Sequence, residues 1–174
     1  MSISVYQKLS IAIVLTPATS SQGLLTTASK KNGIYTYNFA TVPFLADLIR
    51  NITLPLRLDF MGVSSYGNNT VPSELVFTKE LKLEAKNRDV LLVDDILDTG
   101  KTLRAVMDKL DALQPRSLRT CVMLEKKSRR SENITADYVG FDVPDAFVVG
   151  YGLDYAEKYR NLPFIGVLKP EVYS

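Results

Sequence analysis

Residues 90–103 read VLLVDDILDTGKTL, and the organisation of the rest of the chain follows from them. The unbroken apolar run from Val90 to Val93 predicts a strand that is buried on both faces, as the strands of a parallel sheet are. Further along, apolar side chains recur at helical spacing, which predicts a helix after the turn. These side chains are Leu103, Val106, Met107, Leu110 and Leu113.

The turn between this strand and this helix, residues 98–102, reads DTGKT. Such a turn of small and hydroxyl-bearing residues aims backbone N–H groups and the positive end of a helix dipole at one point, where a phosphate can bind. A Walker A loop also ends in Gly-Lys-Thr, but it requires a glycine five residues before Gly100. That position is Asp95, so the motif is not that of a nucleoside triphosphatase.

Asp94, Asp95 and Asp98 stand next to this predicted phosphate site. Asp98 or Thr99 could simply cap the helix. Capping accounts for one acidic residue and not for three. Carboxylates beside an anion site are expected when the ligand also carries hydroxyl groups, a cationic centre or a bridging metal ion.

The composition narrows the class of protein. The chain has 174 residues, 46% of them hydrophobic, which suits a single domain with a sizeable core. The net charge of +2 favours neither a nucleic-acid nor a membrane partner, and no apolar run reaches membrane-spanning length. Histidine is absent, which excludes Ser-His-Asp and Cys-His catalysis. The lone cysteine, Cys121, is expected to be a buried thiol.

Residues 1–38 are the least informative part of the chain. The apolar run from Leu9 to Thr16 follows Lys8, but its basic start is thin and no clean small-residue cleavage site follows, so a secretory signal is disfavoured. A strand or helix that joins the core is the alternative. Residues 34–39 are expected to form a short strand. We therefore expect a cytoplasmic protein.

The segments before the central strand predict a helix and a hairpin. Pro43 suits the first turn of a helix that ends at Arg50. Residues 54–61 alternate, which predicts a half-buried strand. Its core-facing side chains would be Leu54, Leu56, Leu58 and Phe60, with Arg57 and Asp59 on the other face. The polar segment 64–70 could be a plain hairpin loop or a mobile lid, and residues 75–77 would form the returning strand.

The segments after the central helix predict further strands, at 118–124, 139–143 and 146–151, and a helix-like turn over 154–160. The basic cluster 126–130 could be a solvated loop, an RNA contact or the source of one lysine that reaches a ligand. Strands that alternate with helices predict an α/β domain with a mostly parallel sheet, and sites at the carboxyl ends of its strands.

From about Phe44 onward the sequence resembles hypoxanthine-guanine phosphoribosyltransferases, the purine-salvage branch of the type I phosphoribosyltransferases. Four blocks carry the resemblance: 58–67, 90–103, 136–141 and 147–155, the last continuing to Arg160. It implies the type I fold, in which helices flank a mostly parallel central sheet with a flexible lid hairpin and a small hood. A single such domain would cover 1–174, with 1–38 unmatched.

The resemblance also implies an activity. The enzyme would transfer the 5-phosphoribosyl group from phosphoribosyl pyrophosphate to hypoxanthine or guanine, giving IMP or GMP and pyrophosphate, with Mg²⁺ as cofactor. It would work as a homodimer or homotetramer, without a nucleic-acid or membrane partner. Displacing pyrophosphate from the sugar leaves a cationic centre, which fits an acid-rich site with a metal ion.

The resemblance assigns roles to individual residues. Asp98 would exchange a proton with N7 of the purine, a contribution of about 10²–10⁴-fold. Asp94 and Asp95 would bind the ribose hydroxyls and, together with Asp154, the metal ion. The phosphate-binding residues would be Thr99, Gly100, Lys101 and Thr102 for the 5′-phosphate and Arg160 for pyrophosphate.

The remaining roles concern the base and the lid. Lys126 would donate to O6 of the purine and so disfavour 6-amino purines. Phe147 would stack on the ring, and the main chain at Val148 would contact the edge of the base. Ser65 and the catalytic-site residue Tyr66 would belong to a lid that keeps water from the cationic centre.

One segment departs from the family pattern. The family carries a Leu-Lys-Gly loop immediately before the helix at Phe44, and the backbone of that loop binds pyrophosphate. Here residues 38–42 read NFATV, with neither lysine nor glycine. The departure motivates a second hypothesis, a nucleotide-binding homologue with impaired catalysis. A third, an RNA-binding regulator, rests on residues 126–130, but the purine-directed blocks at 136–160 argue against it.

Overall fold

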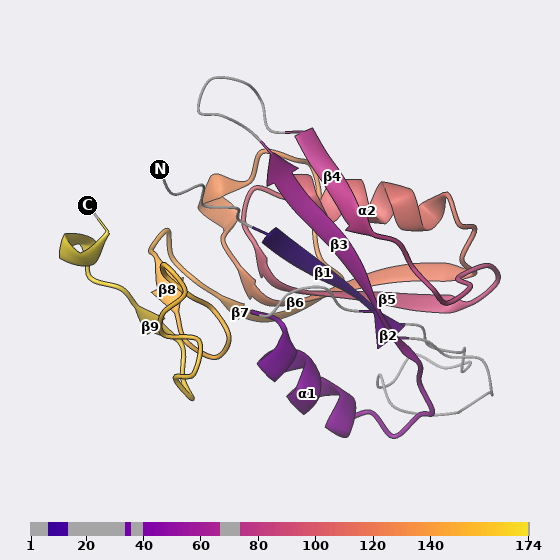
Figure 1. The fold of residues 1–174 in the computed structure, drawn as a ribbon, viewed down its shortest axis with the longest axis horizontal. Helices are drawn as coiled ribbons and strands as arrows, with labels where there is room; N and C mark the ends of the chain where they lie inside the picture. Colours follow the sequence, from indigo (N-terminus) through magenta and orange to yellow (C-terminus); the bar gives the residue numbers. More distant parts are fainter. Residues whose placement is uncertain (1–6, 14–33, 36–39, 67–73, 174) are drawn as a thin grey trace.

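The structure is a computed structural model, and it describes residues 7–13, 34–35, 40–66 and 74–173. Seven strands form the main sheet in the order β4-β3-β1-β2-β5-β6-β7 (Figure 1). Their bounds are Gln7–Ile13 (β1), Ile34–Tyr35 (β2), Leu58–Tyr66 (β3), Glu74–Lys79 (β4), Asp89–Leu97 (β5), Ser117–Glu125 (β6) and Tyr138–Asp142 (β7). Two helices accompany them, α1 (Val42–Arg50) and α2 (Lys101–Asp111), with short 3-10 turns at Lys127–Arg129 (η1) and Pro170–Val172 (η2).

The sheet is mostly parallel, as expected. β2 pairs in parallel with β3 and with β5, and β5, β6 and β7 continue in the same direction. β4 is the antiparallel return of the predicted hairpin. The apolar segment near the amino terminus is a strand, β1, which pairs antiparallel with β3 and contacts β5. The chain therefore has the predicted α/β architecture with one inserted antiparallel strand.

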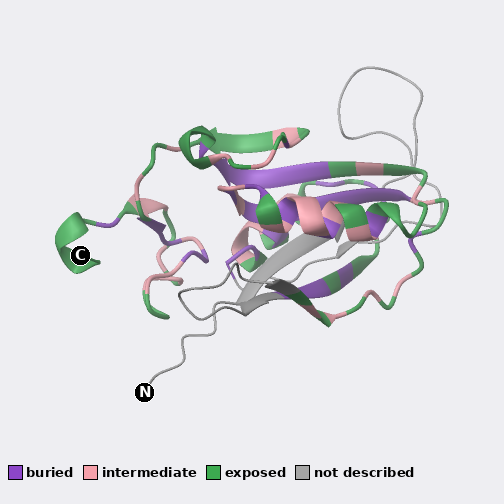
Figure 2. Ribbon diagram, turned by 90° about the horizontal axis from the view of Figure 1, so that it is seen from above, coloured by how far each residue is buried: buried purple, intermediate pink, exposed green. Residues whose placement is uncertain are grey.

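β5 lies at the centre of the core and is buried on both faces, as its sequence predicts. Leu92 and Val90 pack in a cluster with the buried face of α2, whereas Leu91 and Val93 pack in a second cluster with Leu45 of α1. The two helices thus cover opposite faces of the sheet (Figure 1), and buried residues concentrate on β5 and the second half of β6 (Figure 2). In the described part of the chain no helix is long and apolar enough to cross a membrane.

The single cysteine is a buried thiol, as predicted. Cys121 lies in β6 and packs in the cluster under α1. Burial raises the pKa of its thiol to about 11. Such a thiol is structural rather than reactive, because the thiolate is the reactive form.

The prediction for residues 54–61 is wrong about where the strand begins and about which of its side chains are buried. β3 begins at Leu58, and its buried side chains include Asp59 and Met61, while Leu58 and Phe60 are exposed. Asp59 is buried because donors surround its carboxylate: the backbone N–H groups of residues 60, 82 and 83, and the Lys79 ammonium group. These hydrogen bonds lower the pKa of Asp59 although burial, the largest single influence, raises it.

A second, two-stranded sheet follows β7. It pairs β8 (Val148–Val149) with β9 (Gly166–Val167) in antiparallel fashion. The predicted helix-like turn over 154–160 is also wrong. A bridge between Tyr155 and Lys158 closes a tight turn whose central residues, Ala156 and Glu157, have φ angles of 50° and 63°. Left-handed residues cannot propagate a right-handed helix.

Candidate functional site

The carboxyl ends of β5 and β6 bring the predicted site residues together. Asp94 and Asp95 are buried near the end of β5, and Lys126 is buried immediately after β6. The backbone N–H of Lys126 donates to the Leu97 carbonyl at 2.9 Å, which fixes the start of the basic cluster beside the 98–102 turn. Parallel pairing of the two strands therefore places acids and a lysine at one edge of the sheet.

The 98–102 turn presents the amino terminus of α2 without a side-chain cap. Gly100 occupies the N-cap position at a φ of 88° and has no side chain that could cap the helix. The Thr99 hydroxyl accepts only a long hydrogen bond, 3.5 Å, from the backbone N–H of Lys101. The turn forms a small recess, and the Thr99 carbonyl is held by the backbone N–H groups of Ser131 and Glu132 at 3.0 and 3.1 Å. Uncapped N–H groups at a helix start are suited to an anion.

Asp98 is poised to accept a hydrogen bond from a ligand. Its Oδ1 atom is buried and has no hydrogen-bond partner among the described residues. Its Oδ2 atom lies 3.6 Å from a guanidinium nitrogen of Arg129, a neighbour that the sequence alone did not indicate. Because buried acceptors are almost always satisfied, an unpartnered carboxylate oxygen in a recess points to a missing donor.

The carboxylates at this edge of the sheet suit a metal ion that takes some of its ligands from the protein and the rest from the substrate and water. In the described ranges no group of three or more acidic, cysteine or histidine side chains could enclose an ion. Mg²⁺ characteristically takes one or two protein carboxylates and completes its shell with water and substrate phosphates. Asp94 and Asp95, adjacent and buried, meet that requirement.

Asp154 and Arg160, predicted to serve a metal ion and pyrophosphate, contact each other. The Asp154 carboxylate lies 2.9 Å from an Arg160 guanidinium nitrogen and also accepts from the backbone N–H of Glu157. Arg160 donates in addition to the Gly152 carbonyl at 3.0 Å. The turn after β8 therefore holds both side chains in one ionic cluster.

The predicted base-stacking residue lies in an aromatic cluster. The Phe147 ring is partly exposed and has its centroid 5.3 Å from those of both Tyr155 and Tyr173. Val148 follows in β8 and is buried. Sequence reasoning missed the two tyrosines, because no spacing rule connects residues 155 and 173 with 147.

The basic cluster 126–130 is not a free basic surface. Lys127 pairs with Asp142, Arg129 with Asp98 and Asp145, and Arg130 with Glu125. The Lys127 pKa is raised, chiefly by its hydrogen bond to Asp142. Cations already paired with carboxylates offer little to a polyanion, which argues against the RNA-binding alternative.

The lid and the atypical loop are described only in part. The backbone of Ser65 and Tyr66 lies in β3 paired with β4, and residues 67–73 fall outside the described ranges. Residues 38 and 39 also fall outside them, whereas Ala40 and Thr41 are buried immediately before α1. The Thr41 hydroxyl is buried with no hydrogen-bond partner among the described residues.

Comparisons with known proteins agree with this geometry. The family model for the phosphoribosyl transferase domain matches residues 40–156. The hypoxanthine-guanine phosphoribosyltransferase of Bacillus subtilis is 53% identical over 134 residues, which cover 76% of this chain and 74% of that protein. The protein of the same name from Staphylococcus aureus is 50% identical over 132 residues, covering 75% and 74%.

Solved structures give the same result. A hypoxanthine phosphoribosyltransferase from Staphylococcus aureus has a TM-score of 0.74 and 48% identity, with 78% of this chain and 74% of that chain covered. The Trypanosoma cruzi enzyme in complex with the product IMP has a TM-score of 0.71 and 37% identity, covering 86% and 76%. The chain belongs to the phosphoribosyltransferase family. Within that family it falls in the hypoxanthine-guanine branch, which confirms the resemblance seen in its sequence.

Proposed function

We propose that this chain is a purine-salvage enzyme that transfers the phosphoribosyl group from phosphoribosyl pyrophosphate to hypoxanthine or guanine. The observation that carries the proposal is the half-buried Asp98 carboxylate, whose buried Oδ1 atom has no hydrogen-bond partner among the described residues and lies in the turn before α2. A proton acceptor next to an anion site is what this reaction needs. The purine loses a proton as it attacks a sugar that is anchored by its 5′-phosphate.

Different residues would bind the phosphoribosyl group and the purine. The 98–102 turn would hold the 5′-phosphate through N–H groups of Thr99 to Thr102, and Asp94 and Asp95 would orient the ribose hydroxyls. Lys126, Phe147 and Val148 would hold the purine so that N7 faces Asp98. Ser65 and Tyr66, on the β3 side of the hairpin, would help to exclude water. Such positioning removes most of the entropic cost of bringing the reactants together.

The cofactor proposed for this site is Mg²⁺. When bound, it supplies charge neutralisation for the departing pyrophosphate. Asp94 and Asp95 would hold an ion at the ribose. Asp154, which is not grouped with them in the structure, would help to hold a metal ion on the pyrophosphate side. Arg160, beside Asp154, would add a guanidinium group that suits phosphate oxygens. The proposal includes a cytoplasmic location, one phosphoribosyltransferase domain over 1–174 and assembly as a homodimer or homotetramer.

A spectrophotometric assay tests the function directly. Protein, Mg²⁺ and phosphoribosyl pyrophosphate are incubated with hypoxanthine, guanine, xanthine or adenine in turn. Formation of IMP or GMP, with adenine inert, is the expected result. If IMP binds in calorimetry but no base is converted, the chain is a nucleotide-binding homologue and the catalytic proposal fails.

The atypical segment 38–42 should weaken phosphoribosyl pyrophosphate binding. It lacks the lysine and glycine of the family loop, whereas the 5′-phosphate turn at 98–102 is complete. We expect calorimetry with Mg²⁺ to give ordinary IMP affinity and phosphoribosyl pyrophosphate affinity at least about tenfold weaker, the scale of one lost charged hydrogen bond. The Phe39→Lys/Ala40→Gly variant should recover it. Tight binding by the unmodified chain would show that its own backbone N–H groups suffice.

Lys126 should set the choice between 6-oxo and 6-amino purines. Replacing it by Gln should reduce discrimination against adenine by about 10- to 100-fold, because a buried donor no longer opposes the 6-amino group. Phosphoribosyl pyrophosphate affinity should change little. Lys127→Gln is the matched control, since Lys127 is exposed and pairs with Asp142. Unchanged adenine discrimination in Lys126→Gln would remove Lys126 from base recognition.

A further inference from the structure

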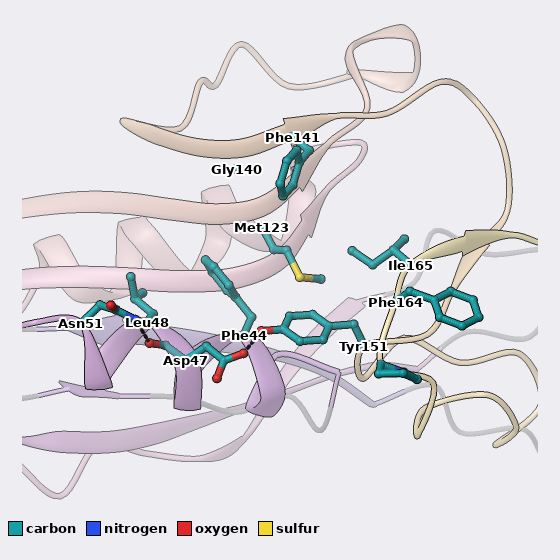
Figure 3. Close-up of a pocket in the computed structure, with 11 residues that line it drawn as sticks. Phe44, Asp47, Leu48, Asn51, Met123, Gly140, Phe141, Tyr151, Phe164 and Ile165 are labelled. Carbon is teal, nitrogen blue, oxygen red and sulfur yellow. Dashed lines mark hydrogen bonds between the residues drawn. The ribbon is translucent and has the colours of Figure 1, made fainter.

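The loop that follows β8 is tied to α1 by one side-chain hydrogen bond. The Tyr151 hydroxyl donates to Oδ2 of Asp47, a residue 104 positions earlier in the chain. Figure 3 shows the tyrosine ring extending from the β8–β9 region toward the helix, with the two side chains meeting beside an apolar cavity of about 430 Å³. The bond therefore joins helix α1 to a loop that is far from it in the sequence.

The backbone around Tyr151 needs such support. Tyr151 itself has a φ of 50°, between Gly150 at 93° and Gly152 at 99°. A tyrosine in the left-handed region persists only where its surroundings fix it. Its N–H donates to the Leu162 carbonyl at 2.8 Å, which secures the loop internally but not to the rest of the domain. The hydroxyl supplies a side-chain hydrogen bond to α1, in addition to the packing of the loop against the start of that helix.

The bond is of the strong, charge-assisted kind. Burial raises the pKa of Tyr151 to about 12, and the bond to Asp47 acts in the same direction. The pKa of Asp47 is lowered, first by Tyr151 and then by Arg50. The hydroxyl loses its proton only as the pH rises toward 12, and the carboxylate loses its charge only below its ordinary pKa of 3.8. Donor and acceptor are thus both in place across the neutral range.

We infer that Asp47 and Tyr151 are positioning residues for purine recognition. Their hydrogen bond holds the loop after β8 against α1 and so positions Phe147 and Val148, which directly precede that loop, before the purine arrives. The inference rests on the proposed function, because it takes Phe147 and Val148 to contact the base. It assigns purine affinity in part to a pair of residues that do not touch the purine.

The inference predicts different effects on the binding of two parts of one ligand, the purine and the ribose 5-phosphate. The ribose and 5′-phosphate residues lie on β5 and in the turn before α2, whereas Phe147 and Val148, two of the residues proposed to contact the base, lie at β8, directly before the Tyr151 loop. Tyr151→Phe removes the hydroxyl and keeps the aromatic ring on the cavity wall. It should weaken IMP binding about three- to tenfold, the scale of one partly exposed charge-assisted hydrogen bond. Ribose 5-phosphate, which lacks the purine, should bind as before.

Matched variants isolate the bond. Asp47→Ala should reproduce the Tyr151→Phe effect, and the double variant should be no worse than either single variant. Asp47→Asn keeps an acceptor oxygen and should recover part of the affinity. Arg50→Gln removes the other partner of Asp47 and should leave IMP affinity unchanged. The KM for hypoxanthine should rise in Tyr151→Phe while kcat is retained.

Three results would count against the inference. Equal loss of IMP and ribose 5-phosphate affinity would mean general disturbance. A lowered Tm with unchanged IMP affinity would mean that the bond only stabilises the fold. Additive single effects would mean that the two side chains act separately. Failure of the unmodified chain to bind IMP or to convert any purine would instead overturn the proposed function.

Discussion

Asp98→Asn should lower the turnover of hypoxanthine by about two to four orders of magnitude, the usual scale for loss of a general acid–base group. The substitution changes almost nothing sterically. The carboxamide fills the same recess and still forms hydrogen bonds, but it cannot take a proton from the purine. The buried Oδ1 atom of Asp98 has no hydrogen-bond partner among the described residues and is therefore free to receive one.

Binding and stability separate this role from a structural one. IMP affinity and Tm should stay close to those of the unmodified chain. Asp142→Asn is the control, since Asp142 is an exposed carboxylate that pairs with Lys127 and lies at the end of β7, on the far side of β6 from β5. Its turnover should not change. Near-normal turnover in Asp98→Asn would remove Asp98 from the proton transfer.

Gly152→Ala should strongly destabilise the fold. A Cβ atom at residue 152 would lie 2.1 Å from the Ala40 carbonyl oxygen and 2.9 Å from Cδ of Pro43. Its φ of 99° is unfavourable for any residue with a side chain. The loop cannot easily retreat, because the Gly152 N–H donates to the Arg160 carbonyl at 2.9 Å.

We expect the free energy of unfolding to fall by about 2–4 kcal/mol, the sum of backbone strain and overpacking. For a domain of this size, that corresponds to a Tm lower by about 5–15 °C. Gly166→Ala is a matched control in the same region, since its Cβ would meet only Phe164 ring atoms at 3.7 and 3.9 Å. Thermal unfolding of both variants decides the matter. Equal Tm values would show that the start of α1 can shift without cost.

The parts of the fold that sequence alone predicted are those governed by local pattern. Four successive apolar residues can be buried on both faces of a strand, and residues 90–93 are. The helix after Gly100 follows from apolar spacing in the same way. The acids and the turn of the site lie in one contiguous segment, so their proximity needed no long-range information.

The failures came from long-range contacts. Asp59 faces inward because the backbone at 82 and 83 donates to it, and no pattern within 54–61 contains that fact. In the turn at 154–160, residues 156 and 157 have left-handed backbone conformations, and an ion pair between Asp154 and Arg160 closes the loop. The sequence left the role of residues 126–130 open between a solvated loop, an RNA contact and a lysine that reaches a ligand, because the ionic partners at 98, 142 and 145 are distant in sequence.

The buried state of Cys121 makes the protein convenient for site-selective labelling. With its pKa at about 11, this thiol is ionised in only about one molecule in a thousand at pH 8, and it is also shielded from reagents. A second cysteine placed on an exposed residue would therefore take a maleimide dye almost alone. Ser128, exposed in η1 two residues after Lys126, is such a position. A fluorophore there would report purine binding while the native thiol stays silent.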